Sequence, residues 1–123
     1  MLNKRQQFGK ESEALAVRHL KKNGYKILEQ NYRNKLGEID IIAKDNGVLV
    51  FVEVKARKTI YYGDPKWAVT PKKQRKISMV ALYYLKTTKQ TQVKARFDVV
   101  ALSLAKDNPR IEIIKNAFEL AYG

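Results

Sequence analysis

With 123 residues, of which 45% are apolar, the chain can bury the core of one ordinary domain, and we expect a single domain over residues 1–123. It has no cysteine, no signal-peptide pattern and no long apolar run, which excludes disulfide scaffolds, cysteine-ligated zinc and a membrane span, and we expect a soluble cytoplasmic protein. Its 25 Lys and Arg residues against 12 Asp and Glu residues give a net charge of +13, which favours nucleic acid as the partner over an inert basic surface or an acidic membrane leaflet.

The first predicted helix covers residues 8–23. Ala16, Val17 and Leu20 share one face at the 3.6-residue spacing of a helix. Glu13 lies in line with this apolar strip, and a carboxylate aimed at a core costs desolvation free energy unless it meets a cation or a hydrogen-bond donor. Glu13 is therefore either a member of an acidic site or one half of a buried salt bridge.

A β-hairpin is predicted next. An extended segment at residues 25–33 leads to two strands, residues 37–44 and 48–55, which are rich in Ile and Val. Asn46-Gly47 between them is the dipeptide typical of a two-residue type I′ turn. Such a turn fixes which residues of the two strands face each other.

In this register Asp40 lies opposite Glu53, and Glu38 lies opposite Lys55. The other face is wholly apolar and consists of Ile39, Ile41, Ala43, Val50, Val52 and Val54. Two carboxylates whose Cβ atoms are roughly 5 Å apart repel each other unless a cation intervenes, and Mg²⁺ or Mn²⁺ is the simplest such cation. Lys55 on the same face can position a water nucleophile or stabilise the phosphate in the transition state. The alternative is that these four residues form a salt-bridge network that closes a sheet edge.

Residues 56–69 are predicted to be irregular. Arg57 and Lys58 extend the positive rim beyond Lys55, as candidate nucleic-acid contacts. The aromatic residues of this segment either stack on unpaired bases or pin the loop to the core, and they are Tyr61, Tyr62 and Trp67.

The second predicted helix begins at Thr70-Pro71, a cap followed by proline at the first helical position, and runs to about Leu85. Its apolar face consists of Ile77, Val80, Ala81 and Tyr84. Lys73 can lean toward the sheet, whereas the outward basic residues of this turn are Lys72, Arg75 and Lys76. These four are candidate phosphate contacts, or else a solvated basic turn, and Gln74 is a weaker candidate at the edge of the site.

A polar loop at residues 86–95 precedes two more strands, at residues 96–102 and 110–115. Asp98, in the middle of the first of these strands, is interpreted as the structural partner of a basic residue. His19 is the only histidine and faces the helix surface, which excludes HNH chemistry and histidine-centred zinc. The order α-β-β-β-α-β-β predicts an α/β fold with a mixed central sheet flanked by helices.

The chain resembles a known bacterial family, the YraN or UPF0102 proteins, which are similar to Holliday-junction resolvases and to the restriction-endonuclease-like PD-(D/E)xK fold. The matching stretches are Gly9 with Glu13-x-x-Ala16, Gly24-Tyr25, Asn31-Tyr32-Arg33, Gly37-Glu38-Ile39-Asp40-Ile41-Ile42-Ala43, Val50-Phe51-Val52-Glu53-Val54-Lys55-x-Arg57, Ala68-Val69 with Lys73, and Arg96-Phe97-Asp98-Val99-Val100. The resemblance implies an endonuclease-like core in which Asp40 and Glu53 bind Mg²⁺ or Mn²⁺, Lys55 is the catalytic lysine, and Glu13 is the helix-borne acid and third metal ligand. Ile39 stands where the PD motif has proline.

The sequence is compatible with two functions. The first is a Mg²⁺- or Mn²⁺-dependent endonuclease that hydrolyses phosphodiester bonds, with branched or flapped DNA as candidate substrates. The second is a non-catalytic nucleic-acid-binding or scaffold protein that retains the nuclease fold. Symmetric cutting of a junction would require a homodimer.

Overall fold

The computed structural model describes residues 2–57, 69–104 and 109–121. Its elements are α1 (Lys4–Lys22), β1 (Lys26–Asn34), β2 (Gly37–Asp45), β3 (Val48–Arg57), α2 (Pro71–Thr87), β4 (Ala95–Ser103) and β5 (Arg110–Phe118). The predicted element order is confirmed. Lys58 and the predicted aromatic contacts of the loop, Tyr61, Tyr62 and Trp67, lie outside the described residues.

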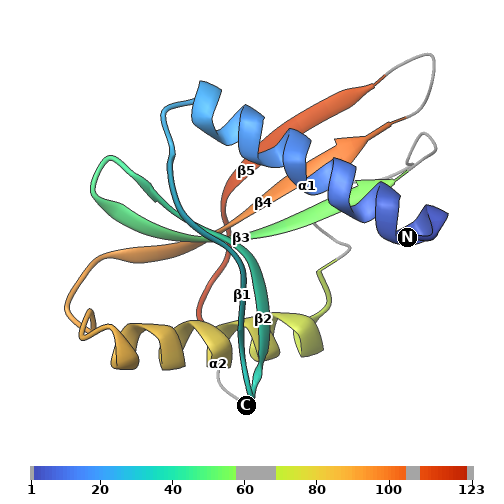
Figure 1. The fold of residues 1–123 in the computed structure, drawn as a ribbon. Helices are drawn as coiled ribbons and strands as arrows, with labels where there is room; N and C mark the ends of the chain where they lie inside the picture. The colour runs from blue at the N-terminus through green and yellow to red at the C-terminus, as the bar shows by residue number, and fades with distance from the viewer. Residues whose placement is uncertain (1, 58–68, 105–108, 122–123) are drawn as a thin grey trace.

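The five strands form one sheet in the order β1-β2-β3-β4-β5. The β3–β4 pair is parallel and the other neighbouring pairs are antiparallel, so the sheet is mixed, as predicted. The parallel pair requires a crossover between β3 and β4, and α2 lies within it. The two helices cover opposite faces of the twisted sheet (Figure 1). The predicted α/β fold is therefore confirmed.

The helix α1 begins four residues earlier than predicted. Asn3 and Gln6 form a capping box, in which the side chain of Asn3 accepts a hydrogen bond from the amide of Gln6 (2.8 Å) and the side chain of Gln6 accepts one from the amide of Asn3 (3.1 Å). This box satisfies two backbone donors and adds a turn before the apolar strip begins. The strip packs on the sheet against Ile41, Ala43, Val50, Val52, Val100 and Leu102.

The helix α2 covers the other face of the sheet. Thr70 caps it by accepting a hydrogen bond from the amide of Lys73 (3.1 Å), and Pro71 is its first residue, as predicted. The predicted inward residues of α2 are all buried, and they pack against Ile39, Ile42, Leu49, Phe51, Phe97 and Val99. The fold thus has two apolar layers, one beneath each helix.

The hairpin turn and most of its register are as predicted. Asn46 and Gly47 have φ angles of +50° and +82°, which a type I′ turn requires, and the pairs run from Asp45–Val48 to Ile41–Val52. The prediction that Ile39 shares a face with Ile41 is wrong. Ile39 packs in the layer beneath α2, whereas Ile41 packs in the layer beneath α1.

The reversal at Ile39 has a local cause in the neighbouring strand β1. Asn31 lies between the Gln30–Ile41 and Tyr32–Ile39 pairs, in line with Asp40, and its φ angle is +54°. A left-handed residue within a strand breaks the regular alternation of faces.

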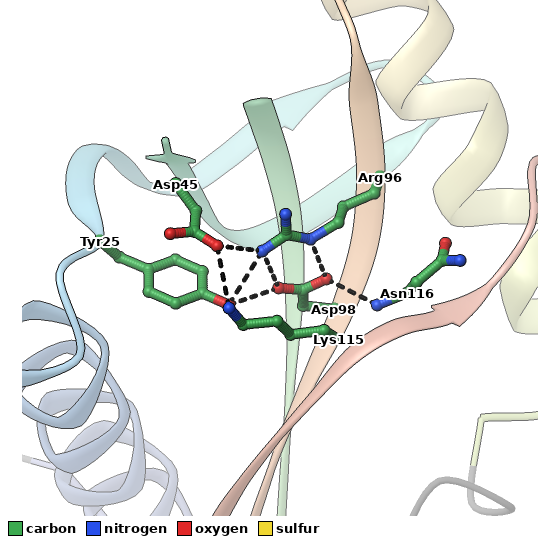
Figure 2. A network of polar contacts seen from close by, with 6 residues as sticks. All are labelled: Tyr25, Asp45, Arg96, Asp98, Lys115 and Asn116. Carbon is green, nitrogen blue, oxygen red and sulfur yellow. Dashed lines mark hydrogen bonds and ion pairs between the residues drawn. The ribbon is translucent and has the colours of Figure 1, made fainter. Parts of the chain in front are cut away.

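A buried polar network joins several elements at the turn end of the hairpin (Figure 2). Arg96 donates to Asp45 at 2.6 Å and to the two carboxylate oxygens of Asp98 at 2.9 and 3.1 Å. The hydroxyl of Tyr25 donates to Asp98 at 2.7 Å, and the amide of Asn116 donates to it at 2.9 Å. Asp98 is thus the structural partner of a basic residue, as predicted.

In the part of the chain that the structure describes, neither helix has the length and apolar character needed to cross a membrane.

Candidate active site

A small recess opens where β2 and β3 stop pairing, beneath the first turns of α2. Its volume is about 210 Å³, below the roughly 300–1,000 Å³ typical of pockets for drug-sized molecules. It is lined by Gly37, Glu38, Asp40, Glu53, Lys73, Lys76 and Ile77. The recess therefore gathers acidic residues from two strands and basic residues from one helix.

Asp40 stands at the point where the two strands separate. Pairing stops at Ile41–Val52, one residue before the predicted Asp40–Glu53 pair, and the carboxylate of Asp40 accepts a hydrogen bond from the amide of Val54 (2.8 Å). The Asp40 side chain thus accepts the hydrogen bond of an amide that would donate to a main-chain carbonyl if the β2–β3 ladder continued. Burial raises the pKa of Asp40, although the Val54 hydrogen bond and the charge of Lys73 act in the opposite direction.

Glu53 reaches the same recess from β3, and its side chain is only 7% exposed. Burial and then the charge of Asp40 raise its pKa to about 6, although Lys73 opposes the rise. The ammonium of Lys73 lies 3.1 Å from its Oε1 atom. Asp40 and Glu53 therefore line the same recess, but the predicted cross-strand pair between them is not formed, because the ladder ends at Ile41–Val52.

Two lysines contribute positive charge here. Burial lowers the pKa of Lys55, and the charges of Lys73 and Arg57 add to this effect while Glu53 opposes it. Burial also disfavours the charged form of Lys73, but attraction to Glu53 and a hydrogen bond to it outweigh the burial and raise the pKa of Lys73. Lys73 is thus the more firmly protonated of the two.

Glu13 approaches from α1, on the other face of the sheet. Its Oε1 atom is buried without a hydrogen-bond partner. Burial raises the pKa of Glu13, and repulsion by Asp40 and Glu38 adds to the rise, whereas a hydrogen bond from the side chain of Asn31 opposes it. Over the described residues no Lys or Arg pairs with Glu13, so the predicted alternative of a buried salt bridge is not seen. Glu13 is an acidic neighbour of Asp40, as its helical position suggested.

Glu38 lines the recess but pairs outward, with Arg33 at 2.7 Å, in a largely exposed ion pair. The salt-bridge network considered from sequence is therefore not formed among Glu38, Asp40, Glu53 and Lys55 themselves, because the basic partners are Arg33 and Lys73. Among the residues that the structure describes, no three histidine or acidic side chains form a group that could hold a metal ion. A cation here would rely on two protein carboxylates plus water or phosphate oxygens, which suffices for Mg²⁺.

The first turn of α2 forms a basic rim beside the recess. Lys72, Arg75 and Lys76 are exposed there, as is Lys73. Lys72 and Arg75 do not line the recess, whereas Lys76, which was predicted to point outward, does. Gln74 does not line the recess, because its side chain donates to the carbonyl of Val69 (3.0 Å) and holds the segment before the cap. Arg57 is half-buried at the end of β3 and donates to the carbonyl of Ala56 (2.9 Å).

Two residues that shape the site are not identified as site residues by the sequence pattern, and they are Asn31 and Gly37. Asn31 turns β1 at Asp40 and contacts Glu13, and an asparagine inside a strand was the available signal, since asparagine tolerates positive φ. Gly37 has a φ angle of +150°, and a Cβ atom there would lie 3.2 Å from Cγ2 of Val80. Glycine at this position allows the start of β2 to lie close against α2.

Comparison with known proteins gives a consistent result. Residues 12–102 match the family described as "Uncharacterised protein family UPF0102". A UPF0102 protein of Syntrophus aciditrophicus is 56% identical over 115 residues, which cover 94% of this chain and 91% of the relative. A UPF0102 protein of Desulfosudis oleivorans is 56% identical over 97% of this chain and 95% of its own length. A UPF0102 protein of Caldicellulosiruptor saccharolyticus is 46% identical over 95% of this chain and 100% of its own length.

Proposed function

This chain belongs to the uncharacterised protein family UPF0102, and we propose that it is a Mg²⁺- or Mn²⁺-dependent endonuclease that hydrolyses phosphodiester bonds in nucleic acid. The observation that carries the proposal is a pair of carboxylates, the half-buried Asp40 and the buried Glu53, in one open recess rimmed by basic residues.

The donor chemistry of the recess fits a hard divalent cation. Burial raises the pKa of Asp40 and Glu53, so an additional positive charge would stabilise their ionised forms. Oxygen ligands from one or two carboxylates, completed by water and phosphate oxygens, are the usual set for Mg²⁺. Bound there, the ion would polarise a phosphoryl oxygen and make a bound water more acidic.

The two carboxylates of the recess and their neighbours Lys55 and Glu13, which do not line it, have distinct roles in this proposal. Asp40, held by the Val54 amide, and Glu53, held in the sheet, keep their carboxylates in place. Lys55 is half-buried, and its ammonium can donate a hydrogen bond to the attacking water or to the negative charge that develops on the phosphate. Glu13 adds a third acid behind Asp40, where it strengthens the local demand for a cation.

A polymeric substrate fits the surroundings better than a small metabolite does. The recess is small and open and is lined mostly by charged residues, and the basic first turn of α2 lies beside it. Helix N-termini and Lys or Arg side chains are common phosphate contacts, and they hold the nucleic-acid backbone without reading its sequence. We propose DNA before RNA, and branched or flapped DNA as the first substrates to test.

The test is a cleavage panel. Duplex, flap and four-way-junction DNA, with matched RNA, are incubated with wild-type protein and Mg²⁺, Mn²⁺ or EDTA. Asp40→Asn is the test variant, because asparagine can still accept the Val54 hydrogen bond while it removes one anionic ligand. Glu112→Gln, at an exposed position of β5, is the control. Cleavage should require metal and Asp40 but not Glu112.

A competing function has its own supporting observation. Lys73 already supplies one positive charge to Glu53, and such a pair can serve a non-catalytic, nucleic-acid-binding protein. Salt-dependent binding without metal affinity and without cleavage of any substrate would favour this alternative. Cleavage that survives both EDTA and Asp40→Asn would show that the activity does not come from this site.

A further inference from the structure

Lys73 and Glu53 form an ion pair at the place where the proposed metal would bind. We propose that Lys73 is the resident counter-ion of Glu53, which a divalent cation displaces, so that the released ammonium becomes a contact for a substrate phosphate. This inference rests on the proposed function, because it concerns how the same site is loaded.

The two partners of the ion pair differ in freedom. The Glu53 side chain is 7% exposed and comes from the middle of the sheet, between β2 and β4. The Lys73 side chain is 48% exposed and comes from the first turn of α2, on a flexible four-carbon stem. When a stronger cation competes for Glu53, Lys73 is the partner that can move.

The other lysines near the recess are less suited to this role. Among the described residues, no carboxylate lies within ion-pair distance of Lys55 or Lys76. Lys55 lies only two residues beyond Glu53 on β3, and Lys76 lines the recess from a position one turn farther along α2. Lys76 therefore offers a matched control for the loss of a positive charge.

Electrostatics couple the two events. An ammonium 3.1 Å from a ligand oxygen repels a dication that binds the same oxygen, so the ion pair must weaken when the metal enters. A released ammonium at the start of α2 is then placed to contact a phosphate near the basic rim. If metal binding releases Lys73 to contact a phosphate, thermodynamic linkage requires the reverse effect. A phosphate that binds Lys73 must then increase the affinity for the metal.

The test measures Mn²⁺ affinity by calorimetry at mildly alkaline pH. Wild type is compared with Lys73→Met, with Lys73→Arg and with Lys76→Met. Lys73→Met should bind Mn²⁺ about fivefold more tightly, the upper range for a half-exposed ion pair, whereas Lys76→Met should change affinity by about twofold or less. Lys73→Arg keeps the charge and should remain near wild type. Inorganic phosphate should tighten Mn²⁺ binding to wild type more than to Lys73→Met.

The possible outcomes separate this inference from the proposed function. Mn²⁺ binding that is equal or weaker in Lys73→Met overturns the counter-ion role while the metal site stands. Equal gains in Lys73→Met and Lys76→Met also overturn it, since they indicate a general charge effect. An absence of Mn²⁺ binding in all four proteins overturns the metal site itself. Binding that is detectable only in Lys73→Met supports the inference most directly.

Discussion

Replacement of Glu53 by glutamine is expected to stabilise the metal-free protein, although it removes half of an ion pair. The pKa of Glu53 is about 6, against an ordinary value of 4.5. The folded protein therefore binds this proton more tightly than the unfolded chain does. The unfolding free energy consequently falls as pH rises from about 4.5 to about 6, and it stays lower above that range. The difference corresponds to about 2 kcal/mol, which is the cost of ionising Glu53 in the folded state.

Glutamine mimics the protonated carboxyl group, so the variant avoids this cost. Urea unfolding between pH 4 and pH 8 should show a gain of about 2 kcal/mol for Glu53→Gln at the alkaline end, or about 6 °C in melting temperature, and almost none at the acidic end. Glu112→Gln, exposed on β5, is the control and should show no such pH-dependent gain. Saturating Mn²⁺ should reverse the order, because wild type gains about 2.7 kcal/mol when the ion is at a hundred times its Kd. A Glu53→Gln protein less stable than wild type at pH 8 would refute the reasoning, because it would mean that Lys73 fully compensates the buried charge.

Three further predictions concern the frame of the site and its rim. Asp98→Asn should lower the unfolding free energy measured in urea by about 3 kcal/mol, because it breaks a buried, hydrogen-bonded ion pair. The folded variant should keep its Mn²⁺ affinity, and a variant as stable as wild type would contradict the prediction. Gly37→Ala should lower the unfolding free energy by about 1–3 kcal/mol in the same assay, because alanine is strained at the positive φ of this position and its Cβ atom would lie close to Val80. A neutral result would show that β2 can shift away from α2. The double variant Lys72→Gln, Arg75→Gln should lower the slope of log K against log salt for duplex DNA by about 2, and an unchanged slope would remove the rim from the interface.

The parts of the fold set by local pattern could be predicted from sequence. Asn46-Gly47 specifies the hairpin register from Asp45–Val48 to Ile41–Val52, because a two-residue turn leaves only one pairing. Asp40 and Glu53 come directly after the last pair of this register and line the same recess. The apolar face of α2 followed from its 3.6-residue spacing, and Thr70-Pro71 marked its start because both residues act locally.

The remaining features depend on contacts between segments that are distant in sequence. The face of Ile39 depends on Asn31 in the neighbouring strand, and nothing in residues 37–44 alone indicates the reversal. Lys73 was predicted to lean toward the sheet, but its pairing with Glu53 depends on the packing of α2 against β2, where Gly37 allows a close approach. Helical periodicity gives the direction of a side chain but not the identity of its partner.

The structure contains two acidic clusters, and the difference between them bears on the structural alternative to a metal site. At the turn end of the hairpin, Asp98 is fully buried, yet its two oxygens receive four hydrogen bonds (Figure 2). Hydrogen bonds from Arg96 and Lys115 lower the pKa of Asp45 in the same cluster, although burial opposes them. This cluster has the character of a structural salt-bridge network.

At the recess the same chain leaves its carboxylates under-compensated. Within the described residues, Asp40 accepts one hydrogen bond from an amide and Glu53 has one ammonium partner, and the pKa of each is raised. Since Arg96 shows that the fold can satisfy buried acids, the smaller number of partners at Asp40 and Glu53 supports the proposal of a cation site there. The two clusters should then respond in opposite ways to neutralisation: Asp98→Asn should destabilise the protein, and Glu53→Gln should stabilise it at the expense of metal binding.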